Sequence, residues 1–483
     1  MARRGITPRC RSLRFAVAST FAASTALASP ASAATSFTRG PYVQDLASRH
    51  VAIMFELDAA HGARLEVFRG ATGEDADAGK TAKSNKDGAH EIVVDGLEPA
   101  TSYRYVVTLD DGTVERGTFT TAPEDARPFS FLVYGDNRTN PYAHAAIVAA
   151  MRKTPGEFLV NTGDMVYDGT QQADWKDFFT IERDLLRDRC LFPAIGNHEI
   201  AMPTSDGALR YARMFRVPAP PEAAERWYTF RWGSARFFML DAQDEFASAE
   251  RAWLDKALEA AKNEAGVVFR FVVLHHGPYS SGLHGPNEAL LLARVPELMR
   301  ATKVDLVLSG HDHIYERGDA NGLRYVVTGG GGAPIYREYR AAKHTQKFEP
   351  VYHFVKIGID GARATYSAMR HDGSVIESCG FMAGTAGWAC GPAGPPAAAS
   401  GAVGSGTPSP TPPAPLPPEP ARRACGCSFV SGGMEWLPLG LAGVLAAGAA
   451  VRPRRRPKRG EGGEGRLDES FREDAEARHN RDE

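Results

Sequence analysis

The feature that most constrains this chain is a series of mostly apolar runs, each followed by a residue that can bind a metal. The last run, Val304–Leu308, is rich in branched apolar residues and predicts a buried strand. Gly310 ends this strand, and His311 and His313 follow on the turn. Neutral imidazoles are common ligands for zinc, iron and copper. An isolated pair of loop histidines is usually a solvated surface feature, so the other runs decide the interpretation.

Four earlier runs repeat this arrangement. They are Phe129–Tyr134 before Asp136, Phe158–Val160 before Asp164, Leu191–Ile195 before Asn197 and His198, and Phe269–Leu274 before His275 and His276. Strands whose carboxyl ends carry ligands form a site at one rim of a sheet, where open α/β folds bind ligands. Glycine precedes the ligand in several segments, and we expect it to provide the sharp turn there. The series predicts a metal site.

These segments resemble the calcineurin-like metallophosphoesterases and, within them, the purple acid phosphatases. The matching motifs are Gly135-Asp136, Gly163-Asp-Met-Val-Tyr167, Gly196-Asn-His-Glu199, His275, Gly310-His-Asp-His313 and Ile314-Tyr-Glu-Arg317. The resemblance covers roughly residues 37–380. It implies an α/β fold, namely a four-layer α-β-β-α metallophosphoesterase sandwich that is preceded by an all-β fibronectin III-like domain.

The resemblance also implies two metal ions and their ligands. The first ion would be held by Asp136, Asp164, Tyr167 and His313, and the second by Asp164, Asn197, His275 and His311. Asp164 would bridge the ions, since a carboxylate has two oxygens. Two such ions clamp the attacking and leaving oxygens of an in-line displacement, and metal-bound water becomes a hydroxide nucleophile near neutral pH. The expected reaction is therefore hydrolysis of a phosphate ester.

The donor set bears on which metals are bound. A phenolate ligand such as Tyr167 favours a hard trivalent ion, and in this family that bond gives the purple colour. We therefore expect iron(III) paired with divalent iron, zinc or manganese. The same motif also occurs with its tyrosine packed away from the metals, and zinc, manganese or calcium then remain open.

Three further residues are candidates for catalysis. His198, beside Asn197, is the first candidate for a phosphate contact or a proton donor. His284 resembles the family's leaving-group histidine by its spacing from His275, although a loop histidine between glycines is equally often idle. Arg138 stands where most relatives carry histidine or glycine. Its guanidinium stays protonated and cannot act as a general acid. It would either grip a phosphate oxygen or pair with a nearby carboxylate.

The ends of the chain predict export. Residues 1–33 read as a secretory signal, with arginines followed by an apolar stretch and the small-residue site Ala31-Ser-Ala33. Two domains should follow, a fibronectin III-like β-sandwich over 36–122 and a metallophosphoesterase domain over 128–380. Within these, we expect helices over 141–153 and 247–263. Cys379 and Cys390 are positioned to pair, and Cys190 reads as a buried thiol.

The C-terminal region reads as a tether. Residues 391–422 are rich in Pro, Ala and Gly, typical of an extended linker. In 425–459 cysteines precede a short apolar span and an arginine cluster, which resembles the MYXO-CTERM sorting tails of myxobacterial surface proteins. A sorting protease would cut such a tail; a single-pass membrane anchor is the alternative. The charged residues 460–483 are expected to be disordered. The enzyme would then lie at the cell surface, in the outer membrane or outside the cell.

Together these features predict a secreted or surface-tethered phosphatase that acts on phosphomonoesters of small molecules or proteins. A phosphodiesterase or nucleotidase is the alternative on the same scaffold, because metal ligands do not encode the substrate. A non-catalytic binding module would be expected to lack some ligands, and all of the predicted ones are present. The net charge of −2, with no basic stripe, argues against nucleic acid as a partner.

Overall fold

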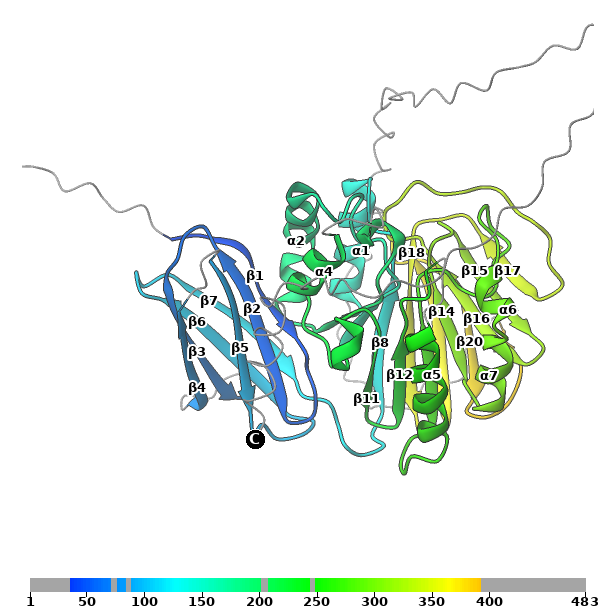
Figure 1. Ribbon diagram of the computed structural model, residues 1–483, viewed down its shortest axis with the longest axis horizontal. Coiled ribbons are helices and arrows are strands. Elements are labelled where there is room, and N and C mark those ends of the chain that lie inside the picture. Colours follow the sequence, from blue (N-terminus) through cyan, green and yellow to red (C-terminus); the bar gives the residue numbers. More distant parts are fainter. Residues whose placement is uncertain (1–34, 71–75, 84–87, 201–206, 244–247, 392–483) are drawn as a thin grey trace, which may run out of the picture. The chain divides into compact units, whose positions relative to one another are not determined.

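The ligand-bearing segments lie in two seven-stranded mixed sheets (Figure 1). The computed structural model describes residues 35–70, 76–83, 88–200, 207–243 and 248–391. The predicted signal 1–33, nearly all of the linker 391–422 and the segments 425–459 and 460–483 lie outside the described residues. Among the described residues, no helix has both the length and the apolar character that crossing a membrane requires.

The first sheet has the strand order β10-β9-β8-β18-β19-β20-β21. Its strands are β8 (Phe129–Tyr134), β9 (Phe158–Asn161), β10 (Leu191–Pro193), β18 (His353–Asp360), β19 (Arg363–Arg370), β20 (Val375–Met382) and β21 (Ala389–Cys390). β8, β9 and β10 run parallel to one another, and β18 is antiparallel to β8. Three ligand segments therefore leave this sheet at one edge.

The second sheet has the order β11-β12-β13-β14-β16-β15-β17. Its strands are β11 (Tyr228–Trp232), β12 (Ala235–Met239), β13 (Phe269–Val273), β14 (Leu306–Ser309), β15 (Tyr315–Ala320), β16 (Leu323–Thr328) and β17 (Thr345–Glu349). β12, β13, β14 and β16 are parallel neighbours. The histidine segments after β13 and β14 thus also leave at a common edge.

Successive side chains of a strand point to opposite faces of the sheet and therefore pack into two different hydrophobic cores. Phe131 of β8 points into an aromatic core between the sheets, with its ring 5.1 Å from that of Phe237 and 5.5 Å from that of Phe271. Its neighbour Leu132 points the other way, into a core shared with helices. Because successive strand residues face opposite sides, each apolar run serves two cores and reads as continuously hydrophobic.

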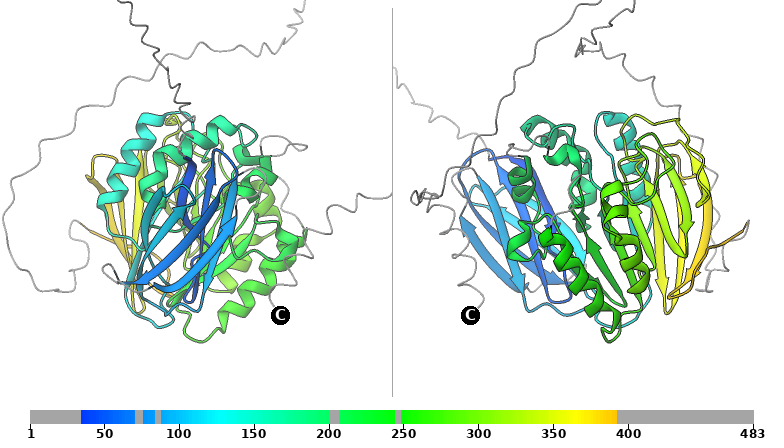
Figure 2. Two further views of the ribbon diagram at one scale, coloured as in Figure 1. Left: turned by 90° about the vertical axis from the view of Figure 1, so that its left-hand side faces the viewer. Right: turned by 45° about the vertical axis from the view of Figure 1, so that its right-hand side comes forward.

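Helices cover the outer face of each sheet (Figure 2). They are α1 (Pro141–Lys153), α2 (Gln172–Leu186), α3 (Asn197–Ile200), α4 (Gly207–Met214), α5 (Ser248–Lys262), α6 (Glu288–Leu292) and α7 (Val295–Ala301), with a 3-10 turn at Pro221–Ala223. Asn140 caps α1 by accepting the N–H groups of Tyr142 and Ala143, and Pro141 opens it. The helix predicted over 141–153 is confirmed, and α5 matches the one predicted over 247–263.

The region before the two seven-stranded sheets is all-β, in keeping with the sequence prediction. One sheet has the order β1-β2-β5 and the other β4-β3-β6-β7. The strands are β1 (Phe37–Gln44), β2 (His50–Leu57), β3 (Gly62–Arg69), β4 (Ala76–Lys83), β5 (Ala89–Asp95), β6 (Ser102–Leu109) and β7 (Val114–Thr120). All strand pairings in these sheets are antiparallel. The α/β class with an all-β leading region is therefore confirmed.

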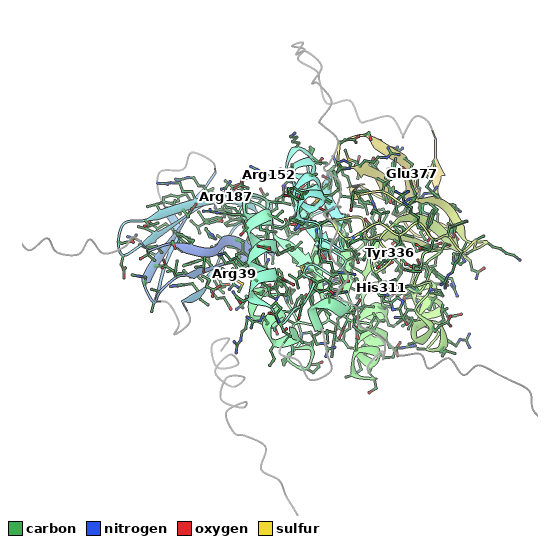
Figure 3. The ribbon with its side chains drawn as sticks, turned by 90° about the horizontal axis from the view of Figure 1, so that it is seen from above. Arg39, Arg152, Arg187, His311, Tyr336 and Glu377 are labelled. Atoms are coloured by element: carbon green, nitrogen blue, oxygen red, sulfur yellow. A yellow bond between two sulfur atoms is a disulfide. The ribbon has the colours of Figure 1, made fainter. Side chains whose placement is uncertain are left out.

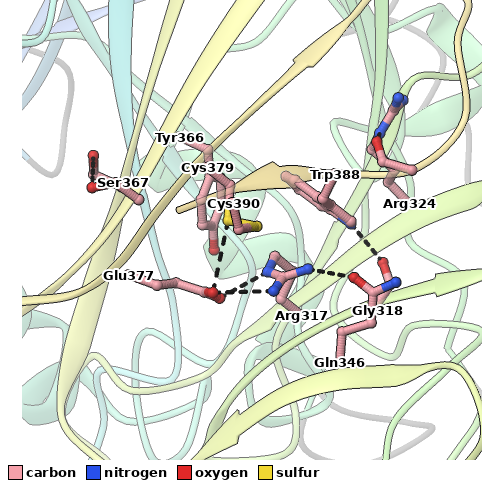
Figure 4. Close-up of a disulfide and its surroundings, with 12 residues drawn as sticks. Arg317, Gly318, Arg324, Gln346, Tyr366, Ser367, Glu377, Cys379, Trp388 and Cys390 are labelled. Carbon is pink, nitrogen blue, oxygen red and sulfur yellow. Dashed lines mark hydrogen bonds and ion pairs between the residues drawn. A yellow bond between two sulfur atoms is a disulfide. The ribbon is translucent and has the colours of Figure 1, made fainter. Parts of the chain in front are cut away.

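A disulfide closes the last hairpin of the first sheet (Figure 4). It joins Cys379 of β20 to Cys390 of β21, which face each other across that strand pair. The predicted pairing is confirmed, as is the buried free thiol of Cys190. Nearby, Glu377 forms an ion pair with Arg317, the last residue of the Ile314–Arg317 motif, with 2.8 Å between Oε1 and Nε. This arginine therefore links the two sheets.

Candidate metal centre

The predicted ligands gather where the parallel strands end. Those that follow β8, β9, β10, β13 and β14 are, in order, Asp136, Asp164, Asn197, His275, and His311 with His313. A carboxylate oxygen from each of Asp136 and Asp164 and a ring nitrogen of His275 all lie within 4.8 Å of one another. Both sheets therefore contribute donors to one place at a shared rim.

Several ligands adopt a backbone conformation that side chains rarely tolerate. Asp136, Asp164 and His311 have φ of 57°, 56° and 69°. Such left-handed residues are uncommon outside glycine and concentrate at functional sites. Gly310 is required for another reason, because a Cβ there would overlap the carboxylate of Asp136. The expectation that glycine makes the turn holds at Gly163, whose φ is 97°, whereas Gly310 is required by its close approach to Asp136 and not by its φ.

The two aspartates are buried and their charges interact. Asp136 is 0% and Asp164 1% exposed. Burial and the charge of Asp164 raise the pKa of Asp136 well above its ordinary range. Burial also opposes ionisation of Asp164. The nearby side chains of His275, His198 and Arg138 favour the charged carboxylate more strongly, so the pKa of Asp164 is lowered. A pair of this kind favours a cation that neutralises both carboxylates.

Backbone carbonyls fix the tautomers of two ligand histidines. Nδ1 of His275 lies 2.9 Å from the carbonyl oxygen of Thr162, and Nδ1 of His313 lies 2.7 Å from that of Pro334. A carbonyl only accepts, so each Nδ1 carries the proton. Nε2 of each ring therefore carries the lone pair that could bind a metal, as in sites where a carbonyl orients the ligand histidine.

These lone pairs point at the acidic residues. Nε2 of His275 lies 3.3 Å from Oδ1 of Asp164 and 3.0 Å from Oδ1 of Asn197. Nε2 of His313 lies 3.5 Å from Oδ1 of Asp136. Carboxylate, amide and imidazole donors suit iron, zinc and manganese. The donor set therefore fits the metals that the sequence predicts.

Glu199 holds two ligand loops together. Its carboxylate is fully buried and accepts four backbone N–H groups, those of Gly196, Asp164, Met165 and Val166, at 2.7 to 3.2 Å. Burial and nearby Asp164 raise the pKa of Glu199 to about 8. The sequence placed Glu199 in a motif but gave it no role. Its position beside the ligand Asn197 was the available signal.

Arg138 lies between two residues predicted to hold the first metal. Its Nε is 3.1 Å from Oδ2 of Asp164, and one terminal nitrogen is 3.3 Å from Nε2 of His313. Tyr167, the third predicted ligand, is 57% exposed, and its ring faces that of His198 at 5.5 Å. The structure thus brings Arg138 to the carboxylate and leaves the Tyr167 ring on the outer side of the site.

His198 borders Asp164. Its backbone N–H donates to Oδ1 of Asp164 at 3.0 Å, and its Nε2 lies 3.8 Å from Oδ2 of the same residue. Its Nδ1 donates to the carbonyl oxygen of Tyr167 at 2.5 Å. Since Nδ1 is the donor, Nε2 is the nitrogen turned toward the site.

His284 covers His311 from the opposite side. Their ring centroids are 4.3 Å apart, and His284 is also 5.4 Å from the ring of Tyr336. Tyr336 in turn stacks on His313 at 4.1 Å, and His311 and Tyr336 lie close together in Figure 3. Sequence analysis missed Tyr336, which has no motif neighbour to mark it.

Comparisons with known proteins agree with this geometry. Residues 129–315 match the family model described as calcineurin-like phosphoesterase. An uncharacterized protein of Mycobacterium tuberculosis is 28% identical over 278 residues, which is 49% of this chain and 52% of the relative. A phosphoenolpyruvate phosphatase of Allium cepa is 28% identical over 51% of this chain and 54% of its own. The chain thus spans about half the length of these relatives.

Two further matches bear on the metals and the fold. An Fe(3+)-Zn(2+) purple acid phosphatase of Arabidopsis thaliana is 26% identical over 52% of this chain and 56% of its own. The solved purple acid phosphatase from seeds of Lupinus luteus has a TM-score of 0.60 at 18% identity, covering 71% of this chain and 74% of the lupin chain. At that identity the likeness concerns the fold alone.

Proposed function

We propose that this chain is a metal-dependent phosphatase that hydrolyses phosphomonoesters, a proposal supported by the match of residues 129–315 to the calcineurin-like phosphoesterase model. The observation that carries the proposal is the convergence of Asp136, Asp164 and His275 at the rim shared by two sheets. The onion relative is by its name a phosphatase of a monoester, phosphoenolpyruvate, which supports the choice of substrate class.

We assign two metal ions to the site. Asp136, Asp164, Tyr167 and His313 would hold the first, and Asp164, Asn197, His275 and His311 the second. When bound, the ions supply the nucleophile and offset the charge of the phosphoryl oxygens. The name of the Arabidopsis relative supports iron(III) with a divalent ion such as zinc. Binding through Tyr167 requires its exposed ring to turn inward from His198.

The chain's own residues would bind and orient the ester. Arg138 presents a guanidinium beside Asp164, and its planar fork of donors matches two phosphate oxygens. The Nε2 of His198 lies on the same side. His284, whose ring lies 4.3 Å from that of His311, would donate the proton to the leaving alcohol. Substrate would thus lie between these groups.

The remaining features extend this proposal. The two catalytic sheets and their helices would form the α-β-β-α sandwich over 128–380, and the all-β region over 36–122 would be a fibronectin III-like spacer. Export through residues 1–33 and tethering through 391–459 would place the enzyme at the cell surface. Partners there would be a phosphorylated small molecule or protein, the membrane and a sorting protease.

The test is hydrolysis of p-nitrophenyl phosphate and bis-p-nitrophenyl phosphate side by side. We expect the monoester to be preferred, and Asp164→Asn to lower its turnover by about 10³-fold or more with the fold retained, because one bridging ligand is lost. Asp168→Asn, on the same loop, is the matched control and should remain active. Preference for the diester would indicate that the protein is a phosphodiesterase. Normal turnover by Asp164→Asn would refute the metal assignment.

A further inference from the structure

The loop that carries His284 is fixed by a carboxylate that lies between two predicted metal ligands. Asp312 separates His311 from His313 in the sequence, yet it does not belong to the cluster of Asp136, Asp164 and His275. It is 1% exposed. A buried carboxylate is costly unless hydrogen bonds satisfy it, so its partners indicate what it does.

All three side-chain bonds of Asp312 go to the His284 loop. Oδ1 accepts the backbone N–H of His284 at 2.9 Å. Oδ2 accepts the hydroxyl of Ser280 at 2.5 Å and the N–H of Gly285 at 3.3 Å. A Cβ on Gly282 would come within 2.5 Å of the carboxyl carbon of Asp312, so the loop wraps closely around this group.

The backbone of this loop is therefore held while the histidine ring is left open to solvent. Gly282 and Gly285, on either side of His284, are buried, whereas His284 itself is exposed. Its ring rests 4.3 Å from that of His311. Two of the hydrogen bonds to Asp312 come from the backbone N–H groups of residues 284 and 285. They therefore fix the backbone position from which the His284 side chain extends.

A second buried carboxylate offers a built-in comparison. Glu316 is 0% exposed and accepts the N–H of Ser281 at 2.6 Å, the hydroxyl of Tyr325 at 2.6 Å and that of Thr345 at 2.9 Å. It anchors the start of the same loop but makes no side-chain bond to residue 284 or 285 among the described contacts. Glu316 thus fixes the loop without fixing the histidine.

We propose that Asp312 is a positioning residue that holds His284 where it protonates the leaving group, an inference that rests on the proposed function. In that step a hydroxide oxygen bonds to phosphorus while the ester's phosphorus–oxygen bond breaks, and the electron pair of the broken bond goes to the leaving oxygen. That oxygen takes a proton from the His284 imidazolium, which becomes neutral imidazole. Asp312 exchanges no proton; it sets the distance between the ring and the leaving oxygen.

The dependence on leaving group separates this role from a structural one. A poor leaving group, such as the alcohol of an alkyl phosphate, needs the proton, whereas 2,4-dinitrophenolate leaves without it. We expect Asp312→Ala to lower kcat for an alkyl phosphate by about 10- to 100-fold, since a misplaced group loses about that much. We expect kcat for 2,4-dinitrophenyl phosphate to fall less than about 3-fold and KM to stay unchanged for both esters.

Variants around Asp312 sharpen the test. Asp312→Asn keeps one oxygen for the N–H of His284 and should recover much of the alkyl phosphate turnover. His284→Gln should reproduce the selectivity of Asp312→Ala, and the double variant should lose no more. Glu316→Gln should affect both esters alike. Ser280→Ala removes one bond to Asp312 without changing the carboxylate, and serves if Asp312→Ala does not fold.

Metal content, measured by elemental analysis on each purified variant, completes the experiment. Equal losses on both esters, with or without metal loss, would assign Asp312 a structural role and overturn the inference. Additive losses with His284→Gln would overturn it as well. If the unaltered, metal-loaded protein hydrolyses neither ester, the proposed function fails and the inference fails with it. Turnover by that protein without selectivity in the variants refutes the inference alone.

Discussion

The Nε nitrogen of Arg138 lies 3.1 Å from Oδ2 of Asp164, and the Arg138 side chain is 12% exposed. The guanidinium also approaches Nε2 of His313. Arginine is therefore directed at the site by the same carboxylate that is assigned to bridge the metals. If Arg138 contacts the phosphate, its charged donor would distinguish substrates by the number of free phosphoryl oxygens that they present.

We predict that Arg138→Ala lowers kcat/KM more for a phosphomonoester than for a diester. A monoester has one more charged oxygen for the guanidinium to bind, and the difference should be about 10-fold or more. Arg138→Lys should recover little, because an ammonium cannot make the paired bonds. Parallel kinetics with both p-nitrophenyl esters measure this. Equal losses on the two esters would contradict a phosphate contact.

We predict that Glu199→Gln weakens metal binding although Glu199 is not a predicted ligand. The glutamine has one acceptor oxygen for four backbone N–H groups, and residues supporting metal ligands typically contribute 10- to 100-fold in affinity. Stability should fall by about 1–3 kcal/mol, the cost of unsatisfied buried N–H groups. Metal titration and urea unfolding measure the two effects. Unchanged metal affinity would limit Glu199 to a folding role.

We predict that Tyr167→Phe removes visible absorbance from the iron-loaded protein. A phenolate bound to iron(III) absorbs visible light, whereas phenylalanine cannot bind. Tyr336→Phe is the matched control, since Tyr336 also lies at the site but is assigned no metal bond. Elemental analysis must show equal iron in all three proteins. An absorbance that survives in Tyr167→Phe and disappears in Tyr336→Phe would transfer the phenolate role to Tyr336.

We predict a pH-dependent contribution to stability from His50 and Asp45 in the all-β region. His50 Nε2 lies 3.5 Å from Asp45 Oδ1, and this hydrogen bond raises the pKa of His50 above its ordinary 6.5. A raised folded pKa means that the stabilisation is complete below about pH 6.5 and is lost as pH rises through the folded value. The pair is partly exposed, so the gain should stay below about 1 kcal/mol.

His50→Gln is the variant that measures this contribution. Urea unfolding at pH 5.5 should show the unaltered protein to be more stable than the variant, and the difference should shrink by pH 8.5. A difference of the same size at both pH values would show that the ion pair is not its source.

Local sequence predicted much of the fold because local signals determine it. Asn140 and Pro141 mark the start of α1, and the apolar runs before Asp136 and Asp164 mark the parallel strands β8 and β9. The motif order then placed the ligand candidates. These inferences need only capping, hydrophobic pattern and residue chemistry, all of which are visible within a few neighbouring positions.

The rest depends on contacts between distant segments. Asp312 binds a loop 28 positions earlier, and Tyr336 reaches His313 only after the chain has passed through two more strands. Which rotamer Tyr167 adopts likewise depends on His198, which belongs to another segment. The motifs place several of these residues in the sequence, but no local pattern indicates which distant side chain each of them contacts.

The left-handed backbone at Asp136 and Asp164 has a practical consequence. In most sites a glycine makes the turn and a neighbour donates the ligand, so the two tasks can be changed separately. At Asp136 one residue performs both, whereas Gly163 shares the turn at Asp164, and among the substitutes for either aspartate asparagine best tolerates this conformation while carrying no charge. An asparagine pair at these positions should leave the rim folded, without its two carboxylate charges but with the guanidinium of Arg138 in place. Such a protein is the natural scaffold for capturing an intact ester.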